Sequence, residues 1–96
     1  MTAVRIGDFA LSGFGAETFS ETGMEIKKGS PSVFTMFASM TDGCIGYLPT
    51  AAAHDEGGYE VDDAPFFYRY PARLKKECES IALEAGLETL GKAFAQ

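Results

Sequence analysis

Apolar residues follow strand-like and then helix-like patterns along the first part of the chain. Residues 4–14 carry apolar side chains on both alternating faces, with Asp8 among them, which predicts a strand. Residues 16–28 place apolar side chains at helical spacing, with glutamates near the start and lysines at the end, an order that suits the helix dipole. Gly29 and Pro31 are typical residues for ending this predicted helix.

The next segment, residues 32–40, is apolar at both odd and even positions, as in a strand that is covered on two sides. We therefore expect it at the centre of the sheet. A strand, a helix and a second strand in this order predict a right-handed crossover and a parallel pair. The expected fold class is α/β: a small two- or three-layer domain with a short, mainly parallel sheet, a βαβ unit and a long C-terminal helix. No linker or repeat divides residues 1–96, so a single domain is expected.

The C-terminal segment predicts a helix over residues 72–94 with two apolar stripes about half a turn apart. Either this helix bends near Gly86 or it is buried on two sides. In an isolated chain of this length, burial on a second side predicts a partner, most simply a second copy, and hence a homodimer. The stripes consist of Leu74, Cys78, Ile81 and Ala85, and of Leu83, Leu87, Leu90 and Phe94.

A turn-rich segment follows the predicted strand of residues 32–40 and precedes the C-terminal helix. Tyr47 and Tyr59 bracket this segment. Ordering such a segment costs roughly 1 to 2 kcal/mol of conformational entropy per residue, which indicates a site there. A short helical turn is expected near residues 50–55. The aromatic-rich residues 62–71 that follow are interpreted either as a lid over the core or as the lining of a groove or subunit contact.

The composition is that of a folded, acidic protein. Of 96 residues, 46% are hydrophobic and 23% charged, and the formal net charge is −6. No basic stripe is present to neutralise phosphates, so a nucleic-acid partner is not expected. The N-terminus lacks the pattern of an export signal and no apolar run reaches the ~18 residues of a membrane span, so we expect a cytoplasmic protein with no membrane span. Cys44 and Cys78 lack C-x-x-C spacing and are interpreted as reduced thiols.

The sequence contains few residues that could belong to a complete catalytic site. The single histidine, His54, is interpreted as an exposed residue of the short helix, because a catalytic zinc usually needs three protein ligands. Cys44 has no neighbouring base in the sequence. Gly13 and Gly15 could cradle a phosphate, but a tight turn from strand to helix is favoured. Glu17 either interacts with the N-terminus of the predicted helix or lies in a ligand site at the carboxyl end of a parallel strand.

Several segments, in their order along the chain, resemble the C-terminal part of the catalytic domain of the neutral/alkaline ceramidase family and its bacterial ceramidase-like relatives. The resemblance covers roughly residues 4–95. It is carried by Ile6-Gly-Asp-Phe-Ala-Leu-Ser-Gly-Phe-Gly-Ala-Glu17, by the strand of residues 34–40, by Gly46-Tyr-Leu-Pro-Thr50 and by Glu56-Gly-Gly-Tyr-Glu60.

The resemblance implies a part of a zinc amidohydrolase that cleaves the N-acyl bond of ceramide. By motif position, Glu17 and Tyr47 would match two zinc ligands of the family. Tyr59 would match a catalytic tyrosine that hydrogen-bonds the developing oxyanion. The two zinc-binding histidines of the family belong to a region that this chain lacks, and His54 falls where the family has no ligand.

Three readings remain open. The chain is a stand-alone ceramidase-like fragment without hydrolase activity of its own, which acts as a small binding or interaction protein and holds no cofactor. Alternatively, it is a subunit of a zinc-dependent amidohydrolase whose histidines come from another chain, the missing catalytic-domain partner. In the third reading it merely shares a strand-turn-helix pattern with the family.

Overall fold

The structure, a computed structural model, describes residues 1–95 and begins with a hairpin. Strand β1 (Thr2–Ile6) pairs antiparallel with β2 (Phe9–Gly13), so the single strand predicted over residues 4–14 is wrong. The two residues of the turn are Gly7 and Asp8, and Gly7 has a φ of 60°. A Gly-Asp pair between two apolar runs is a typical two-residue hairpin loop, which the sequence-based interpretation overlooked.

The strand-helix-strand unit is confirmed. Helix α1 (Ser20–Gly29) connects β2 to β4 (Phe34–Ala38), and these strands pair in parallel. The strand order β1-β2-β4 gives a mixed sheet, in which β4 is an edge strand rather than the predicted centre. A second, two-stranded sheet pairs β3 (Glu17–Thr18) in parallel with β5 (Tyr47–Leu48). The protein is therefore a small α/β domain whose sheets contain both kinds of pairing.

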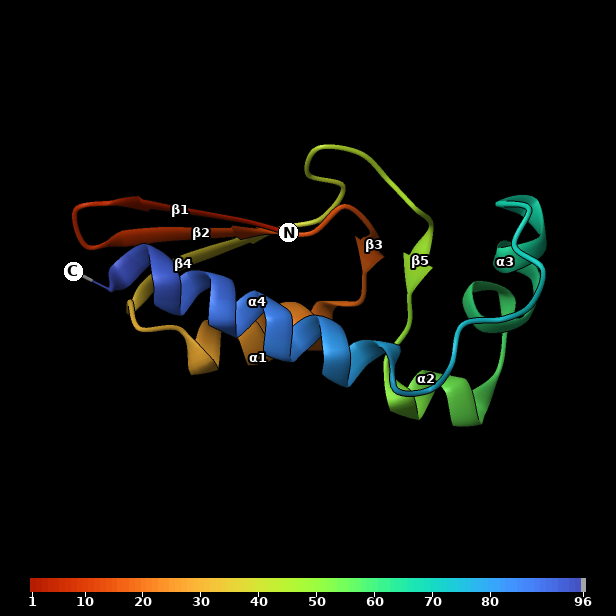
Figure 1. Ribbon diagram of the computed structural model, residues 1–96. Helices are drawn as coiled ribbons and strands as arrows, with labels where there is room; N and C mark the ends of the chain where they lie inside the picture. Colours follow the sequence, from red (N-terminus) through yellow and green to blue (C-terminus); the bar gives the residue numbers. More distant parts are fainter. Residues whose placement is uncertain (96) are drawn as a thin grey trace.

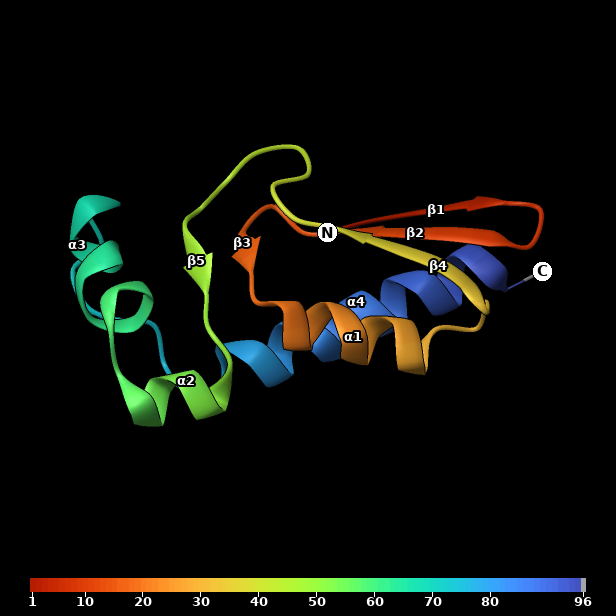
Figure 2. The same cartoon turned by 180° about the vertical axis from the view of Figure 1, so that it is seen from behind.

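Helix α4 (Cys78–Phe94) and α1 lie on the same side of the three-stranded sheet (Figures 1 and 2). The predicted start at residue 72 is too early, because residues 72–77 are not helical and α4 begins at Cys78. One apolar stripe is covered within the chain, since Leu87 packs against Gly29 of α1 and Leu90 is fully buried in the core. In the other stripe, Cys78 is half-buried, whereas Ile81 is 65% exposed. Helix α4 is continuous through Gly86, and cover of the exposed Ile81 by a partner stays a prediction.

The remaining helices extend beyond the sheet, on the side away from the β1–β2 hairpin (Figure 1). They are α2 (Ala51–Glu56), a short π-helical turn η1 (Tyr59–Asp63) and α3 (Ala64–Phe67). The molecule is consequently elongated, with extents of 42 × 24 × 16 Å. The helical turn expected near residues 50–55 is confirmed. The lid interpretation of residues 62–71 is wrong, since Phe66 and Phe67 are exposed. Among residues 1–95 no helix is both long and apolar enough to cross a membrane.

Candidate functional site

Glu17 and Tyr47 are direct neighbours across the β3–β5 pair. They are register partners in this parallel ladder, and the amide of Glu17 donates to the carbonyl of Gly46 at 2.8 Å. Side chains of register partners project to the same side of a sheet. Glu17 is therefore a strand residue opposite a tyrosine, and its interpretation as a first-turn helix carboxylate is wrong.

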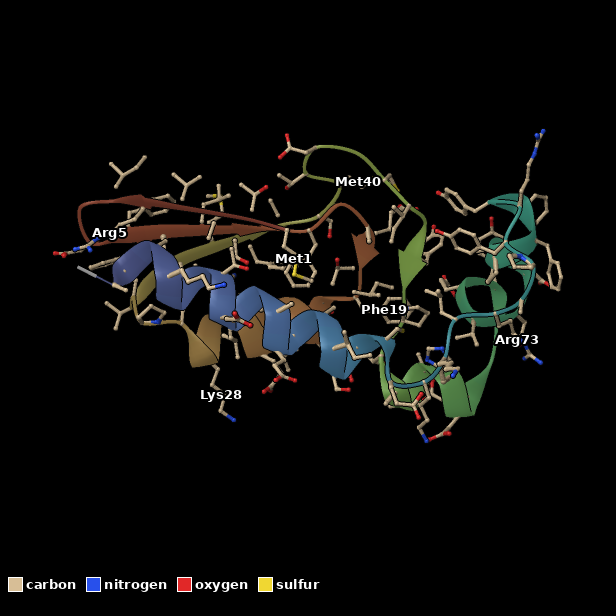
Figure 3. The ribbon with its side chains drawn as sticks, viewed as in Figure 1. Met1, Arg5, Phe19, Lys28, Met40 and Arg73 are labelled. Carbon is tan, nitrogen blue, oxygen red and sulfur yellow. The ribbon has the colours of Figure 1, made fainter. Side chains whose placement is uncertain are left out.

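Tyr59 joins this pair from η1. Its ring lies edge-on to the ring of Tyr47, with 6.0 Å between centroids and an interplanar angle of 83°. The ring of Phe67 also lies 6.0 Å from that of Tyr59, tilted by 41°. Edge-to-face contacts at this separation are favourable for aromatic rings. The structure thus brings together all three predicted site residues, Glu17, Tyr47 and Tyr59; Figure 3 shows the side chains of this end of the molecule between β5 and α3.

Negative charge surrounds the Tyr47 phenol. The Glu17 carboxylate is the largest cause of a raised pKa of Tyr47, followed by burial, Tyr59 and Glu60. Tyr47 therefore keeps its proton at neutral pH and can act as a hydrogen-bond donor. The ion pairs within residues 1–95 join Arg73 to Asp62, Lys76 to Asp55 and Lys92 to Glu88, and none of them includes Glu17 or Glu60. The site is thus an aromatic cluster with two carboxylates near Tyr47, Glu17 and Glu60, that take part in none of these ion pairs.

Two further residues border the site: Cys44, which the sequence analysis considered only as a nucleophile, and Tyr68, which it placed in the aromatic-rich residues 62–71. The Cys44 sulfur lies 3.9 Å from the Tyr68 hydroxyl, and this hydrogen bond is the largest cause that raises the pKa of Tyr68 to about 12, ahead of burial and nearby charges. Tyr68 also faces Gly46, where a Cβ atom would lie 3.1 Å from its ring. The aromatic run around residues 66–70 was the available signal, but sequence alone does not show that it folds back onto Cys44 and Gly46.

His54 lies outside this group and links two other segments. It is half-buried in α2 rather than exposed as predicted, because its Nδ1 lies 3.0 Å from the Thr50 carbonyl and its Nε2 lies 3.2 Å from the Leu74 carbonyl. Both ring nitrogens are thus engaged with backbone oxygens. This arrangement ties α2 to the segment that leads into α4 and leaves neither nitrogen directed at Tyr47.

Gly13 and Gly15 allow the chain around Thr41 to lie close against them, and neither leads directly into a helix. A Cβ atom on Gly13 would lie 2.7 Å from the Thr41 side chain, and one on Gly15 would lie 3.4 Å from the Thr41 carbonyl. The amide of Thr41 donates to the carbonyl of Phe14 at 2.9 Å. Both glycines thus pack against the segment around Thr41. Because β3 rather than a helix follows them, the turn from strand to helix predicted at this point is wrong.

An apolar cleft of about 480 Å³ lies on the other side of the β3–β5 pair. Leu48, which alternates with Tyr47 in β5, and Ala16, the residue before β3, contribute to its lining. Cys78 of α4 also lines it, and burial is the main cause of the raised pKa of this thiol. The cleft is therefore separate from the carboxylate and tyrosine group.

The residues gathered at the site do not by themselves fit a zinc ion. Within residues 1–95, no group of three or more His, Cys, Asp or Glu side chains is placed to hold a metal. Glu17 and Tyr47 are two ligands, and zinc sites in enzymes usually have three from the protein. No family model matches the chain, and neither the curated proteins nor the solved structures gave a match.

Proposed function

We propose that this chain is a ceramidase-like fragment that acts as a small binding or interaction protein and does not hydrolyse amides on its own. The observation that supports this most is the grouping of Glu17, Tyr47 and Tyr59 at one end of the molecule. The resemblance assigns these three residues to one site. Their proximity is what the resemblance predicts for residues of one site.

Zinc analysis of the isolated chain tests the absence of independent activity. After incubation with zinc chloride and dialysis, we expect much less than one equivalent of zinc, because two ligands hold this metal weakly. A fluorescent ceramide is expected to stay intact under the same conditions. The proposal would be contradicted if the chain retained one equivalent of zinc and hydrolysed the ceramide, and if Glu17→Gln abolished this hydrolysis while Glu21→Gln preserved it. Glu21 serves as the control because it is an exposed carboxylate of α1.

A second candidate function is that of a subunit of a zinc-dependent amidohydrolase whose histidines come from another polypeptide. The specific observation in its favour is the pair of carboxylates, Glu17 and Glu60, near Tyr47 without an ion-pair partner among residues 1–95. A cation supplied from outside would compensate this charge.

Reconstitution distinguishes the two candidates. The chain would be mixed with the histidine-bearing part of a ceramidase-like catalytic domain, and zinc retention and ceramide hydrolysis would be measured. The subunit proposal expects both in the mixture, loss of both with Glu17→Gln, and wild-type values with Glu21→Gln. For Tyr59→Phe it expects retained zinc and a rate lower by about 10²- to 10³-fold, the usual loss for one oxyanion donor. Equal behaviour of Glu17→Gln and Glu21→Gln would refute it.

A further inference from the structure

Three aromatic rings, those of Tyr47, Tyr59 and Phe67, form a group that we name the aromatic corner. The rings of Tyr47 and Tyr59 are nearly perpendicular, at 83°, and the ring of Phe67 is tilted by 41° from that of Tyr59. The centroids are 6.0 Å apart in each pair. Tyr59 is 47% exposed and Phe67 is 75% exposed. Much of the ring surface is therefore open to solvent and is not part of the core.

Two carboxylates border the aromatic corner. Glu17 is the register partner of Tyr47, so both side chains project to the same side of the β3–β5 pair. Glu60 follows Tyr59 in η1. Both carboxylates are close enough to raise the pKa of Tyr47, with Glu17 as the largest cause and Glu60 as a smaller one. Neither takes part in the ion pairs found among residues 1–95, so the rings lie beside two negative charges.

We infer that the aromatic corner binds a small organic cation with a trimethylammonium group, such as choline. This ligand class depends on the proposed function of the chain as a binding protein, and it belongs to the same site. A quaternary ammonium is attracted to the face of an aromatic ring at up to about 6 Å from the centroid. Because the centroids of Tyr47 and Tyr59 are 6.0 Å apart, one cation can lie within this range of both rings. The carboxylate of Glu17 adds a direct charge attraction.

The geometry of the rings and the nearby charges favour this cation over others. Two ring faces at nearly right angles contact a rounded trimethylammonium group on two sides, whereas a planar guanidinium stacks on one ring at a time. A metal ion lacks ligands, because no three His, Cys, Asp or Glu side chains of the described residues are placed to hold one. Glu17 and Glu60 would repel a phosphate beside the ammonium, so a cation without phosphate is favoured over a phosphocholine group.

The cations of the chain itself are engaged elsewhere. The guanidinium of Arg5 lies over the ring of Phe94, 4.5 Å from its centroid, at the end of the molecule opposite to α3 (Figures 1 and 3). In the described part of the chain no other Lys or Arg lies over an aromatic ring. Arg73 is paired with Asp62 of η1. A cation from solution, attracted by the net charge of −6, therefore meets an unoccupied pair of ring faces.

Titration of the full chain with choline chloride, in buffer that contains EDTA to remove zinc, tests the inference. The ring signals of labelled tyrosines are followed by NMR. Those of Tyr47 and Tyr59 are expected to shift in a saturable way, with a Kd on the order of 1 to 10 mM because the corner is open to water. Equal concentrations of sodium chloride are the control for ionic strength.

Two further ligands test the chemical class. The neutral analogue of choline, in which a tert-butyl group replaces the trimethylammonium group, has the same shape without the charge. It is expected to leave the tyrosine signals unshifted over the same range. Phosphocholine is expected to bind at least about twofold more weakly than choline, because its phosphate is repelled by Glu17 and Glu60.

Two pairs of variants locate the contact. Glu17→Gln and Phe67→Leu are each expected to weaken choline binding by about two- to fivefold, whereas Glu21→Gln and Phe66→Leu keep the wild-type affinity. Glu21 is an exposed carboxylate of α1, and Phe66 is the neighbour of Phe67 in α3 and is exposed at 64%. Far-UV circular dichroism verifies that each variant is folded.

Each contrary result would overturn the inference. No saturable shift up to about 50 mM choline would exclude a cation site of the expected affinity. Equal shifts with the tert-butyl analogue would mean that the corner is only an apolar patch, and equal shifts with sodium chloride would mean only screening. Phosphocholine that binds as tightly as choline would contradict the role of the carboxylates. Equal behaviour of the two members of either variant pair would place the contact elsewhere.

Zinc retention and ceramide hydrolysis test the proposed function separately from choline binding. If choline does not bind while the chain retains no zinc and leaves ceramide intact, the ligand class alone is wrong. Retained zinc with hydrolysis would contradict the proposed function whatever the result with choline.

Discussion

Alanine substitution of two glycines in the same helix is expected to have opposite effects on stability. Both Gly86 and Gly91 lie within α4, where alanine improves helix propensity by about 1 kcal/mol at each position. Gly86 is buried, whereas an added Cβ atom on Gly91 would meet no atom within 4 Å. The pair of variants separates the contribution of packing from that of propensity.

At Gly86, α4 lies close against the core. A Cβ atom there would lie 2.7 Å from Cζ of Phe14 and 2.8 Å from Cδ1 of Ile26. Neither neighbour can move easily, because Ile26 is fully buried and the Phe14 ring is held edge-on to Phe37 at 5.0 Å. Overpacking of this kind costs about 1 to 3 kcal/mol. After the gain in propensity, Gly86→Ala is expected to be up to about 2 kcal/mol less stable than wild type, and Gly91→Ala about 0.5 to 1 kcal/mol more stable.

Urea unfolding followed by far-UV circular dichroism measures both effects, with equal slopes as the sign that the unfolded state is unchanged. In a domain of this length, each kcal/mol corresponds to a shift of roughly 4 to 8 °C in Tm, so thermal unfolding provides a second measurement. If Gly86→Ala were as stabilising as Gly91→Ala, α4 could not be docked with Gly86 against Phe14 and Ile26, and the arrangement of the core would be refuted.

Three further predictions concern α2, the thiols and the site. Thr50 caps α2 by accepting from the Ala53 amide at 3.1 Å, so Thr50→Ala is expected to cost about 0.5 to 2 kcal/mol in urea unfolding, and Thr50→Ser much less. The exposed Cys44 is expected to react with Ellman's reagent before Cys78, because burial is the main cause of the raised pKa of the Cys78 thiol. The variants Cys44→Ser and Cys78→Ser identify which thiol gives each reaction phase. Equal rates for the two thiols would contradict the burial of Cys78 in α4. Glu17→Gln is expected to bring the raised pKa of Tyr47 back toward its ordinary value near 10, with Glu21→Gln as control, in an NMR titration of labelled tyrosines. Because the folded-state pKa is the higher one, the stability from the neutral phenol is present below about pH 10 and is lost as the pH rises through the folded value. An unchanged Tyr47 titration in Glu17→Gln would mean that the two side chains do not meet.

Local sequence patterns predicted the elements better than their placement. The βαβ unit, the turn near residues 50–55 and the long C-terminal helix follow from spacing and end signals close to each element. The hairpin at Gly7 was missed because both of its strands continue one alternating apolar pattern. The predicted start of α1 is too early. Glu17 and Thr18 have ordinary helical spacing, but they form β3 because they pair with Tyr47 and Leu48. Such pairing depends on a segment about thirty residues away, which no local pattern contains.

The glycines before Glu17 explain how the site residues come together. Because Gly13 and Gly15 have no side chain, the segment from Thr41 onward can run against them, and its amides at Thr41 and Ile45 donate to the carbonyls of Phe14 and Gly15. This contact extends the parallel alignment of β2 and β4 past the end of the sheet and brings the next residues into register. The pairing of Glu17 with Tyr47 is thus a consequence of the same backbone approach that the two glycines permit. The Gly-x-Gly motif of residues 13–15 therefore positions Glu17, the carboxylate that follows it. The length of the loop between β4 and β5 determines that Glu17 pairs with Tyr47.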